Sequence, residues 1–280
     1  MKRLAVIFPG IGYTAEKPLL HYSRRIAERF GYESLILPYS GFPKKVKGDR
    51  GKLKKSCEIA LAQAEEMLAD VDMSGCEDIL FIGKSIGTVA AACIAAESPV
   101  RDRIRFVMYT PLDETFACPL KDAIVFTGSA DPWVGGEVNC IPSLCEQQKI
   151  SCMIVEDANH SLETPDPQTD VWNLRVIMDR TADFIREEQL RRIAYHEKLL
   201  TELEQALSEP AAEEELAAIR EKADRLALYY ASSDWKMDFA DDEADLLPKD
   251  MKRGVLSEDG IFNALEAFRD LCEETGKPGS

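Results

Sequence analysis

The sequence has few histidines, no long apolar run and no paired cysteine motif. Only three histidines occur in 280 residues, and the first apolar run, Leu4–Phe8, stops at Pro9 and Gly10. That run is too short for the core of a signal peptide, and no other segment approaches the length of a membrane span. The eight cysteines lack the C-x-x-C spacing of zinc and redox sites. We therefore expect a cytoplasmic protein with reduced thiols and no bound metal.

Basic side chains are outnumbered by acidic ones, 34 to 50. The net charge is −16 at pH 7, and residues 187–280 hold 24 acidic but only 12 basic side chains. Such a surface repels the phosphates of nucleic acids and anionic lipids. We expect neither a nucleic-acid partner nor a membrane partner.

Two hydrophobic patterns divide the chain into predicted domains at 1–186 and 187–280. In the first, short apolar runs alternate with amphipathic stretches, as in βαβ units. The runs predict six strands, at Leu4–Phe8, Ser34–Leu37, Ile79–Ile82, Ile104–Tyr109, Ala123–Thr127 and Cys152–Val155. The amphipathic stretches predict helices at Leu19–Phe30, Lys52–Leu68, Gly87–Ala96, Val171–Ile185 and, more weakly, 137–148. We predict an α/β fold with a doubly wound, mostly parallel six-stranded sheet whose strands are buried on both faces.

After Ile185 the pattern becomes purely helical. Two apolar stripes flank Pro210 and predict a helical hairpin. The first consists of Ile193, Leu200, Leu203 and Leu207, and the second of Leu216, Ile219, Ala223, Leu226 and Tyr230. Residues 235–255 are predicted to be irregular, and Ser257 to cap a last helix. The acidic residues between Asp238 and Asp245 lack EF-hand spacing and predict a solvated face. This all-α domain is a candidate for homo-oligomer contacts, partner binding or a cover over the first domain.

The motif Gly83-Lys84-Ser85-Ile86-Gly87 lies between a predicted strand and a predicted helix. In a G-x-S-x-G turn of this kind the serine sits on strained backbone, and glycines are needed where a Cβ would collide with neighbouring chain. Ser85 is therefore the candidate nucleophile, exposed at the carboxyl edge of the sheet. The alternative is a glycine-rich turn with a helix-capping serine.

A serine hydroxyl becomes a strong nucleophile when a histidine accepts its proton. His160 lies on the loop after the last predicted strand, whereas His21 and His196 fall inside helical patterns. His160 is the candidate general base because loops at strand ends usually carry the chemistry of such folds. Its alternative role is that of an ordinary surface histidine.

An acid must orient that histidine, and two aspartates are candidates. Asp131 follows the predicted strand Ala123–Thr127, and Asp157 lies on the loop of His160 itself. We favour Asp131 because it follows a strand end, as Ser85 and His160 do, and the carboxyl ends of parallel strands meet at one edge of the sheet.

Backbone amides can hold the oxyanion that forms when a serine attacks a carbonyl. The predicted donors are the N–H of Ile86, at the start of the helix, and that of Ile11, in the loop Pro9–Gly12. The alternative for this loop is a phosphate-binding turn, but it lacks the G-x-G-x-x-G and G-K-[ST] patterns. No cofactor is expected.

Together, Gly83 to Gly87, Asp131 and His160 resemble the α/β-hydrolase superfamily across about residues 1–186. The runs from Phe8 to Thr14, Asp131 to Trp133 and Asn159 to Glu163 resemble a compact branch of bacterial hydrolases. The resemblance implies a catalytic triad in the order serine, aspartate, histidine, and a sheet that begins at the superfamily's third strand. The tail, residues 187–280, is similar to a small helical bacterial domain of unknown function, most visibly at residues 252–260.

The short segment between Tyr109 and Ala123 has no room for a helical lid. An open cleft is implied, with Ile11, Tyr13, Phe116 and Trp133 as candidate pocket residues, although aromatic side chains of this kind are commonly core. We predict a serine hydrolase that cleaves a carboxylic ester or thioester of a small intracellular molecule. The alternative is a catalytically silent protein of the same fold whose acidic helical tail recruits a partner.

Overall fold

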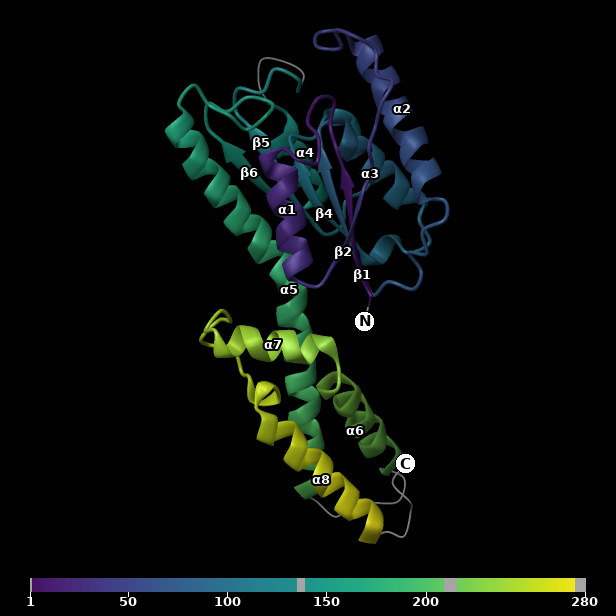
Figure 1. Ribbon diagram of the computed structural model, residues 1–280, viewed down its shortest axis with the longest axis vertical. Helices are drawn as coiled ribbons and strands as arrows, with labels where there is room; N and C mark the ends of the chain where they lie inside the picture. The colour runs from purple at the N-terminus through teal and green to yellow at the C-terminus, as the bar shows by residue number, and fades with distance from the viewer. Residues whose placement is uncertain (1, 135–138, 209–215, 275–280) are drawn as a thin grey trace. The chain divides into compact units, whose positions relative to one another are not determined.

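The computed structural model describes residues 2–134, 139–208 and 216–274. The chain divides into two compact units, Met1–Ile185 and Arg186–Ser280 (Figure 1). The first contains a β-sheet covered by helices, and the second is helical. Each unit has its own buried core.

The sheet of the first unit has six strands in the order β2-β1-β3-β4-β5-β6. Their bounds are β1 Arg3–Phe8, β2 Glu33–Ile36, β3 Asp78–Lys84, β4 Ile104–Tyr109, β5 Ala123–Gly128 and β6 Ser151–Val155. All five pairings are parallel. The predicted six-stranded α/β sheet is confirmed.

Helices cover both faces of this sheet because successive side chains of a strand point to opposite faces. Ala5 and Ile7 of β1 pack in one core with α1 (Pro18–Arg29) and the first part of α5 (Pro167–Ser208). Leu4 and Val6 pack in the other with α2 (Arg50–Leu68), α3 (Ile86–Glu97) and α4 (Ile141–Gln148). The sheet is therefore doubly wound, as predicted.

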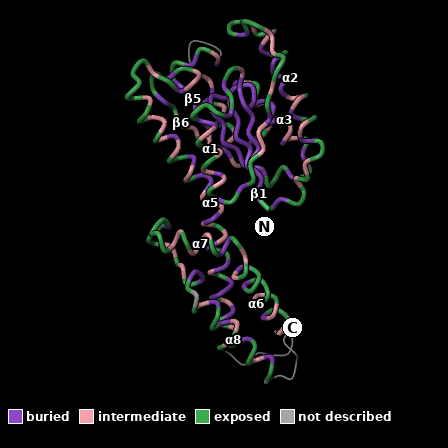
Figure 2. Tube along the Cα trace, viewed as in Figure 1, coloured by how far each residue is buried: buried purple, intermediate pink, exposed green. Residues whose placement is uncertain are grey.

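The prediction that every strand is buried on both faces is wrong for the two edge strands. Glu33 and Ser34 of β2 are exposed, as are Ser151 and Ile154 of β6. A strand at the end of a sheet has a neighbour on one side only, so flanking helices cover it less completely. The four inner strands are buried almost throughout, as the burial colouring shows (Figure 2).

The second unit consists of the last part of α5 with α6 (Leu216–Tyr230), α7 (Ser233–Glu243) and α8 (Glu258–Glu274). Its core joins the two predicted stripes, including Ile193, Leu203, Ile219 and Leu226. The predicted C-terminal all-α region is confirmed, whereas Pro210 lies outside the described residues. Short 3₁₀ turns stand at Arg101–Arg103, Asp113–Ala117 and Gly254–Leu256. No helix in the described ranges has the length and hydropathy needed to cross a membrane.

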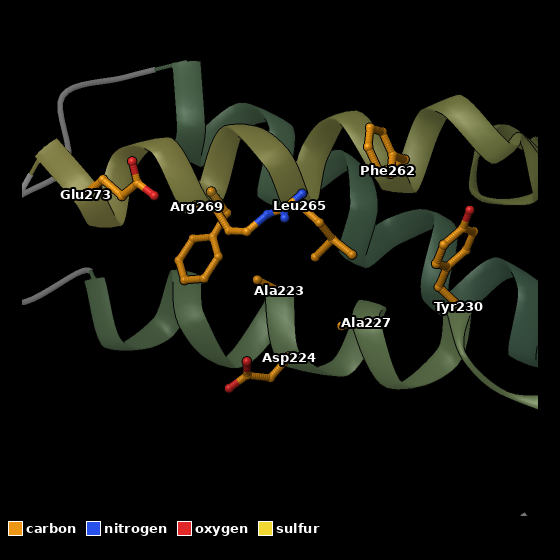
Figure 3. Close-up of a pocket in the computed structure, with 9 residues that line it drawn as sticks. Ala223, Asp224, Ala227, Tyr230, Phe262, Leu265, Arg269 and Glu273 are labelled. Carbon is orange, nitrogen blue, oxygen red and sulfur yellow. The ribbon is translucent and has the colours of Figure 1, made fainter. Parts of the chain in front are cut away.

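Helices α6 and α8 lie side by side and leave a groove of about 400 Å³ between them. Ala223 and Ala227 of α6 line this groove together with Phe262 and Leu265 of α8, and the Leu265 side chain points toward α6 (Figure 3). Arg269 is the basic side chain among the groove's lining residues.

Two local predictions for the C-terminal half are wrong. The helix predicted to end at Ile185 continues without a break to Ser208. The segment predicted to be irregular contains α7, because the Ser232 hydroxyl accepts a hydrogen bond from the Trp235 amide at 3.1 Å and caps the helix.

Asp238, predicted to belong to a solvated acidic face, is fully buried. Arg192 donates to its carboxylate twice, at 2.6 and 3.0 Å, and the Tyr229 hydroxyl donates at 2.7 Å. A buried carboxylate requires such partners because its desolvation is costly. Asp238 therefore links α7 to α5 and α6 inside the second unit.

Candidate active site

The site is built around the turn that joins β3 to α3. Ser85 occupies this turn with φ 56° and ψ −125°, a conformation that non-glycine residues rarely adopt. A Cβ on Gly87 would lie 2.1 Å from the carbonyl oxygen of Phe8, so only glycine lets the new helix start this close to β1. The strained serine turn expected from the motif is present, whereas the expectation that Ser85 is exposed is wrong, because only 6% of its surface is exposed.

The loop after β1 lies directly against Ser85. A Cβ added to Gly10 would lie 3.1 Å from the Cβ of Ser85. The amide of Gly10 donates to the carbonyl of Tyr13 at 3.1 Å, so it is not directed at Ser85. The amide of Ile11 is the next along the loop, and that of Ile86 stands in the first turn of α3, where it has no intrahelical acceptor.

The structure brings Ser85, His160 and Asp131 into one hydrogen-bonded chain. The Ser85 hydroxyl lies 2.7 Å from Nε2 of His160. Nδ1 of His160 lies 2.7 Å from Oδ2 of Asp131 and donates to it, because a carboxylate can only accept. The remaining oxygen of Asp131 accepts from the Trp133 amide at 2.9 Å. Both ends of the imidazole are therefore oriented.

Gly128, at the end of β5, allows the aspartate and histidine loops to approach each other. A Cβ there would lie 2.1 Å from the carbonyl oxygen of Ala158. That same carbonyl accepts from the Ala130 amide at 3.0 Å, which joins the two loops. The alternative acid, Asp157, is exposed two residues after the end of β6, with φ 55°, and has no hydrogen bond to His160 among the described contacts.

Burial and charge set the protonation of His160. Burial lowers the pKa of His160 below its usual value, and the positive charge of Lys84 lowers it further, whereas Asp131 acts in the opposite direction. The ring of Trp133 stacks on the imidazole with centroids 5.0 Å apart and an interplanar angle of 23°. Burial and the charge of Lys84 together favour a neutral imidazole that can accept a proton.

The candidate pocket residues have different surroundings. Trp133 covers His160, as described, and Phe116 is half-buried against the core that includes α3. Tyr13 is buried, and its hydroxyl accepts from the Leu19 amide at 3.2 Å. It also lines a cavity of about 140 Å³ with Leu162 and Ile177.

Lys84 is part of the site but was not singled out by its sequence. It is 1% exposed, and its ammonium group donates to the Thr110 hydroxyl at 2.5 Å and to the His160 carbonyl at 2.7 Å. Thr110 also departs from ordinary backbone geometry, with φ 40°. The available signal was a lysine inside an otherwise continuous buried strand, since buried lysines are rare without a specific role.

Residues 190–276 match the family model described as a domain of unknown function, DUF4298. This match confirms the predicted likeness of the tail to a helical domain of unknown function. No curated protein matches the chain.

Solved structures to which the chain is similar include an α/β serine hydrolase without a lid from Xanthomonas campestris. It is 14% identical with a TM-score of 0.45, over 65% of this chain and 81% of its own. Est1E from Butyrivibrio proteoclasticus is 14% identical with a TM-score of 0.46, over 66% of this chain and 88% of its own. An esterase from Pyrococcus furiosus is 15% identical with a TM-score of 0.45, over 66% of this chain and 82% of its own.

Proposed function

We propose that this protein is a serine hydrolase that transfers an acyl group from a carboxylic ester or thioester to water. The observation that carries this proposal is the hydrogen-bonded chain from Ser85 through His160 to Asp131 on a strained strand-to-helix turn. A serine, a histidine and an acid in this relation form the machinery that activates a hydroxyl nucleophile.

In the first half-reaction, the Ser85 oxygen attacks the carbonyl carbon while its proton moves to Nε2 of His160. The Ile11 and Ile86 amides stabilise the negative oxygen of the tetrahedral intermediate. The bond to the leaving group then breaks, and the departing alcohol or thiol takes the proton from His160. Asp131 holds the imidazolium that exists between these steps.

In the second half-reaction, His160 removes a proton from water, and the resulting hydroxide attacks the acyl-serine. Collapse of this intermediate releases the carboxylic acid and returns the proton to Ser85. The segment after β4 holds only the short turn Asp113–Ala117 before β5 begins, so it provides no helical lid over the serine. A small or extended acyl substrate suits such a site better than a long lipid.

Labelling of the intact protein with a fluorophosphonate probe tests this proposal. We expect one equivalent of probe on Ser85, located by mass spectrometry of the modified peptide. Ser85→Ala and His160→Ala should both abolish labelling, because the first removes the nucleophile and the second its base. A well-folded protein that is not labelled would favour the catalytically silent alternative.

The pH dependence of hydrolysis is expected to follow His160. Because burial lowers the pKa of this imidazole, the neutral and active form should persist to acidic pH. We expect the acidic limb of the kcat/KM profile of a short-chain ester to have its midpoint below pH 6.5, the usual histidine value. A midpoint above 6.5 would contradict the electrostatic description of the site.

A further inference from the structure

A buried lysine stands next to the nucleophile and takes no part in the steps above. Lys84 ends β3, and its ammonium group contacts Thr110 at the end of β4 and the carbonyl of His160. The Thr110 hydroxyl in turn donates to the same carbonyl at 3.0 Å. The ends of two central strands are thereby tied to the histidine loop.

The partners of this ammonium group are neutral. Its two hydrogen bonds go to a hydroxyl and a carbonyl, and it lies 5.0 Å from the centroid of the Tyr13 ring. The carboxylates of Asp131 and Glu163 act on this ammonium group by electrostatic attraction, not by a hydrogen bond. A fully buried cation without a direct ion pair is costly, so its retention here calls for an explanation.

We propose that Lys84 is a positioning residue of the active site, whose buried ammonium group fixes the His160 loop and opposes protonation of the His160 ring. This inference rests on the proposed function, since it assigns the lysine to the general base of that reaction. The hydrogen bond from Lys84 to the His160 carbonyl restrains the His160 loop. The positive charge of Lys84 repels the imidazolium form of the His160 side chain.

The order in which the two groups bind protons supports this role. Burial lowers the pKa of Lys84 to about 7, while the pKa of His160 lies below its usual value of 6.5. Below pH 7, where His160 gains its proton, Lys84 is therefore mainly charged. Besides Lys84, the charged groups that act on His160 are Asp131 and the exposed Lys47. Asp131 attracts the imidazolium, and the two lysines oppose it.

The test is a direct titration of His160 by long-range ¹H–¹⁵N NMR in the full-length protein. Three histidines occur in the chain, and the His160 signal is identified by its loss in His160→Ala. We expect Lys84→Met and Lys84→Gln each to raise the pKa of His160 by about one pH unit, because both remove the cation. Glutamine can still donate to the His160 carbonyl, so it separates charge from hydrogen bonding.

Lys17→Met is the matched control. Lys17 also lies over the Tyr13 ring, at 5.8 Å, but it is exposed and does not contact His160. It should leave the His160 titration and the kinetics unchanged. An unchanged pKa in both Lys84 variants would overturn the inference, and a rise with methionine alone would assign the effect to the hydrogen bond and overturn the role of the charge.

The stability of the wild-type protein provides a second measurement. Because the pKa of Lys84 is about 7 in the folded state and 10.5 ordinarily, the unfolded chain binds more protons between these values. From pH 7 to pH 9, the free energy of unfolding of the wild-type protein should therefore rise relative to that of Lys84→Met. At pH 6 the variant should have the higher urea midpoint. Equal pH dependence of the two proteins would contradict a buried charged lysine.

Neither measurement needs a substrate. If the fluorophosphonate probe does not label Ser85 while the His160 titration shifts as expected, the proposed hydrolysis fails and the electrostatic link between Lys84 and His160 stands. If Ser85 is labelled and the titration does not shift, the hydrolase proposal stands and the role of Lys84 fails.

Discussion

Alanine at Ser85 or at His160 should lower kcat for a short-chain ester by about 10⁶-fold, and Asp131→Asn by about 10⁴-fold. Ser85→Ala removes the nucleophilic oxygen, and His160→Ala removes the group 2.7 Å from it that accepts its proton. Asparagine at 131 keeps the shape of the side chain but offers no charge to the imidazolium, and its amide favours the wrong tautomer. Steady-state kinetics with p-nitrophenyl acetate measures all three.

Asp157→Asn is the control for Asp131. It makes the same change of one atom and one charge on the loop of His160, and Asp157 has φ 55°, a conformation that asparagine tolerates well. Because Asp157 is exposed and does not contact the imidazole, kcat should remain within twofold of wild type. A loss of 10³-fold or more in Asp157→Asn would make it the orienting acid instead of Asp131.

Gly87→Ala is expected to cause a large loss of stability, at least about 3 kcal/mol, or to prevent folding. The new Cβ would lie 2.1 Å from the carbonyl oxygen of Phe8 and 2.5 Å from that of Pro9. The first atom belongs to the last residue of β1 and the second to the loop that follows, so neither can move without disturbing the sheet or the loop beside Ser85. Urea unfolding measures the change.

Gly51→Ala is a control at the same position of another helix. Gly51 is the second residue of α2, as Gly87 is of α3. The nearest atom to a Cβ at Gly51 is the Asp49 carboxylate oxygen at 3.4 Å, which is ordinary contact. Alanine there should stabilise the protein by about 0.5–1 kcal/mol through helix propensity. A similar loss from both substitutions would show that close backbone packing is not what requires glycine at 87.

The main errors of the sequence interpretation arose where tertiary contacts decide local structure. The α5 helix continues past Ile185, and the sequence did hold a sign of this, because no glycine or proline occurs between Pro167 and Ser208. The α7 helix was missed because its acidic sequence resembles a loop, whereas burial of Trp235 and Asp238 stabilises it. The helix propensity of this segment does not include the effect of Arg192, which neutralises Asp238 from another helix.

For the candidate active site, the sequence alone determined which residue types stand at the carboxyl ends of the strands, and hence the candidate nucleophile and the candidate base. This was possible because parallel strands bring those ends to one edge, and because the motif around Ser85 joins a strand to a helix.

Only the tertiary structure separates the two candidate acids, Asp131 and Asp157, because both follow strand ends and the difference is a contact of 2.7 Å between Asp131 and His160. It also revealed Lys84, whose partners Thr110 and His160 are distant in the chain. Hydrogen bonds and buried charge depend on positions to within a fraction of an ångström, and such positions follow from the packing of the whole sheet rather than from any segment of sequence.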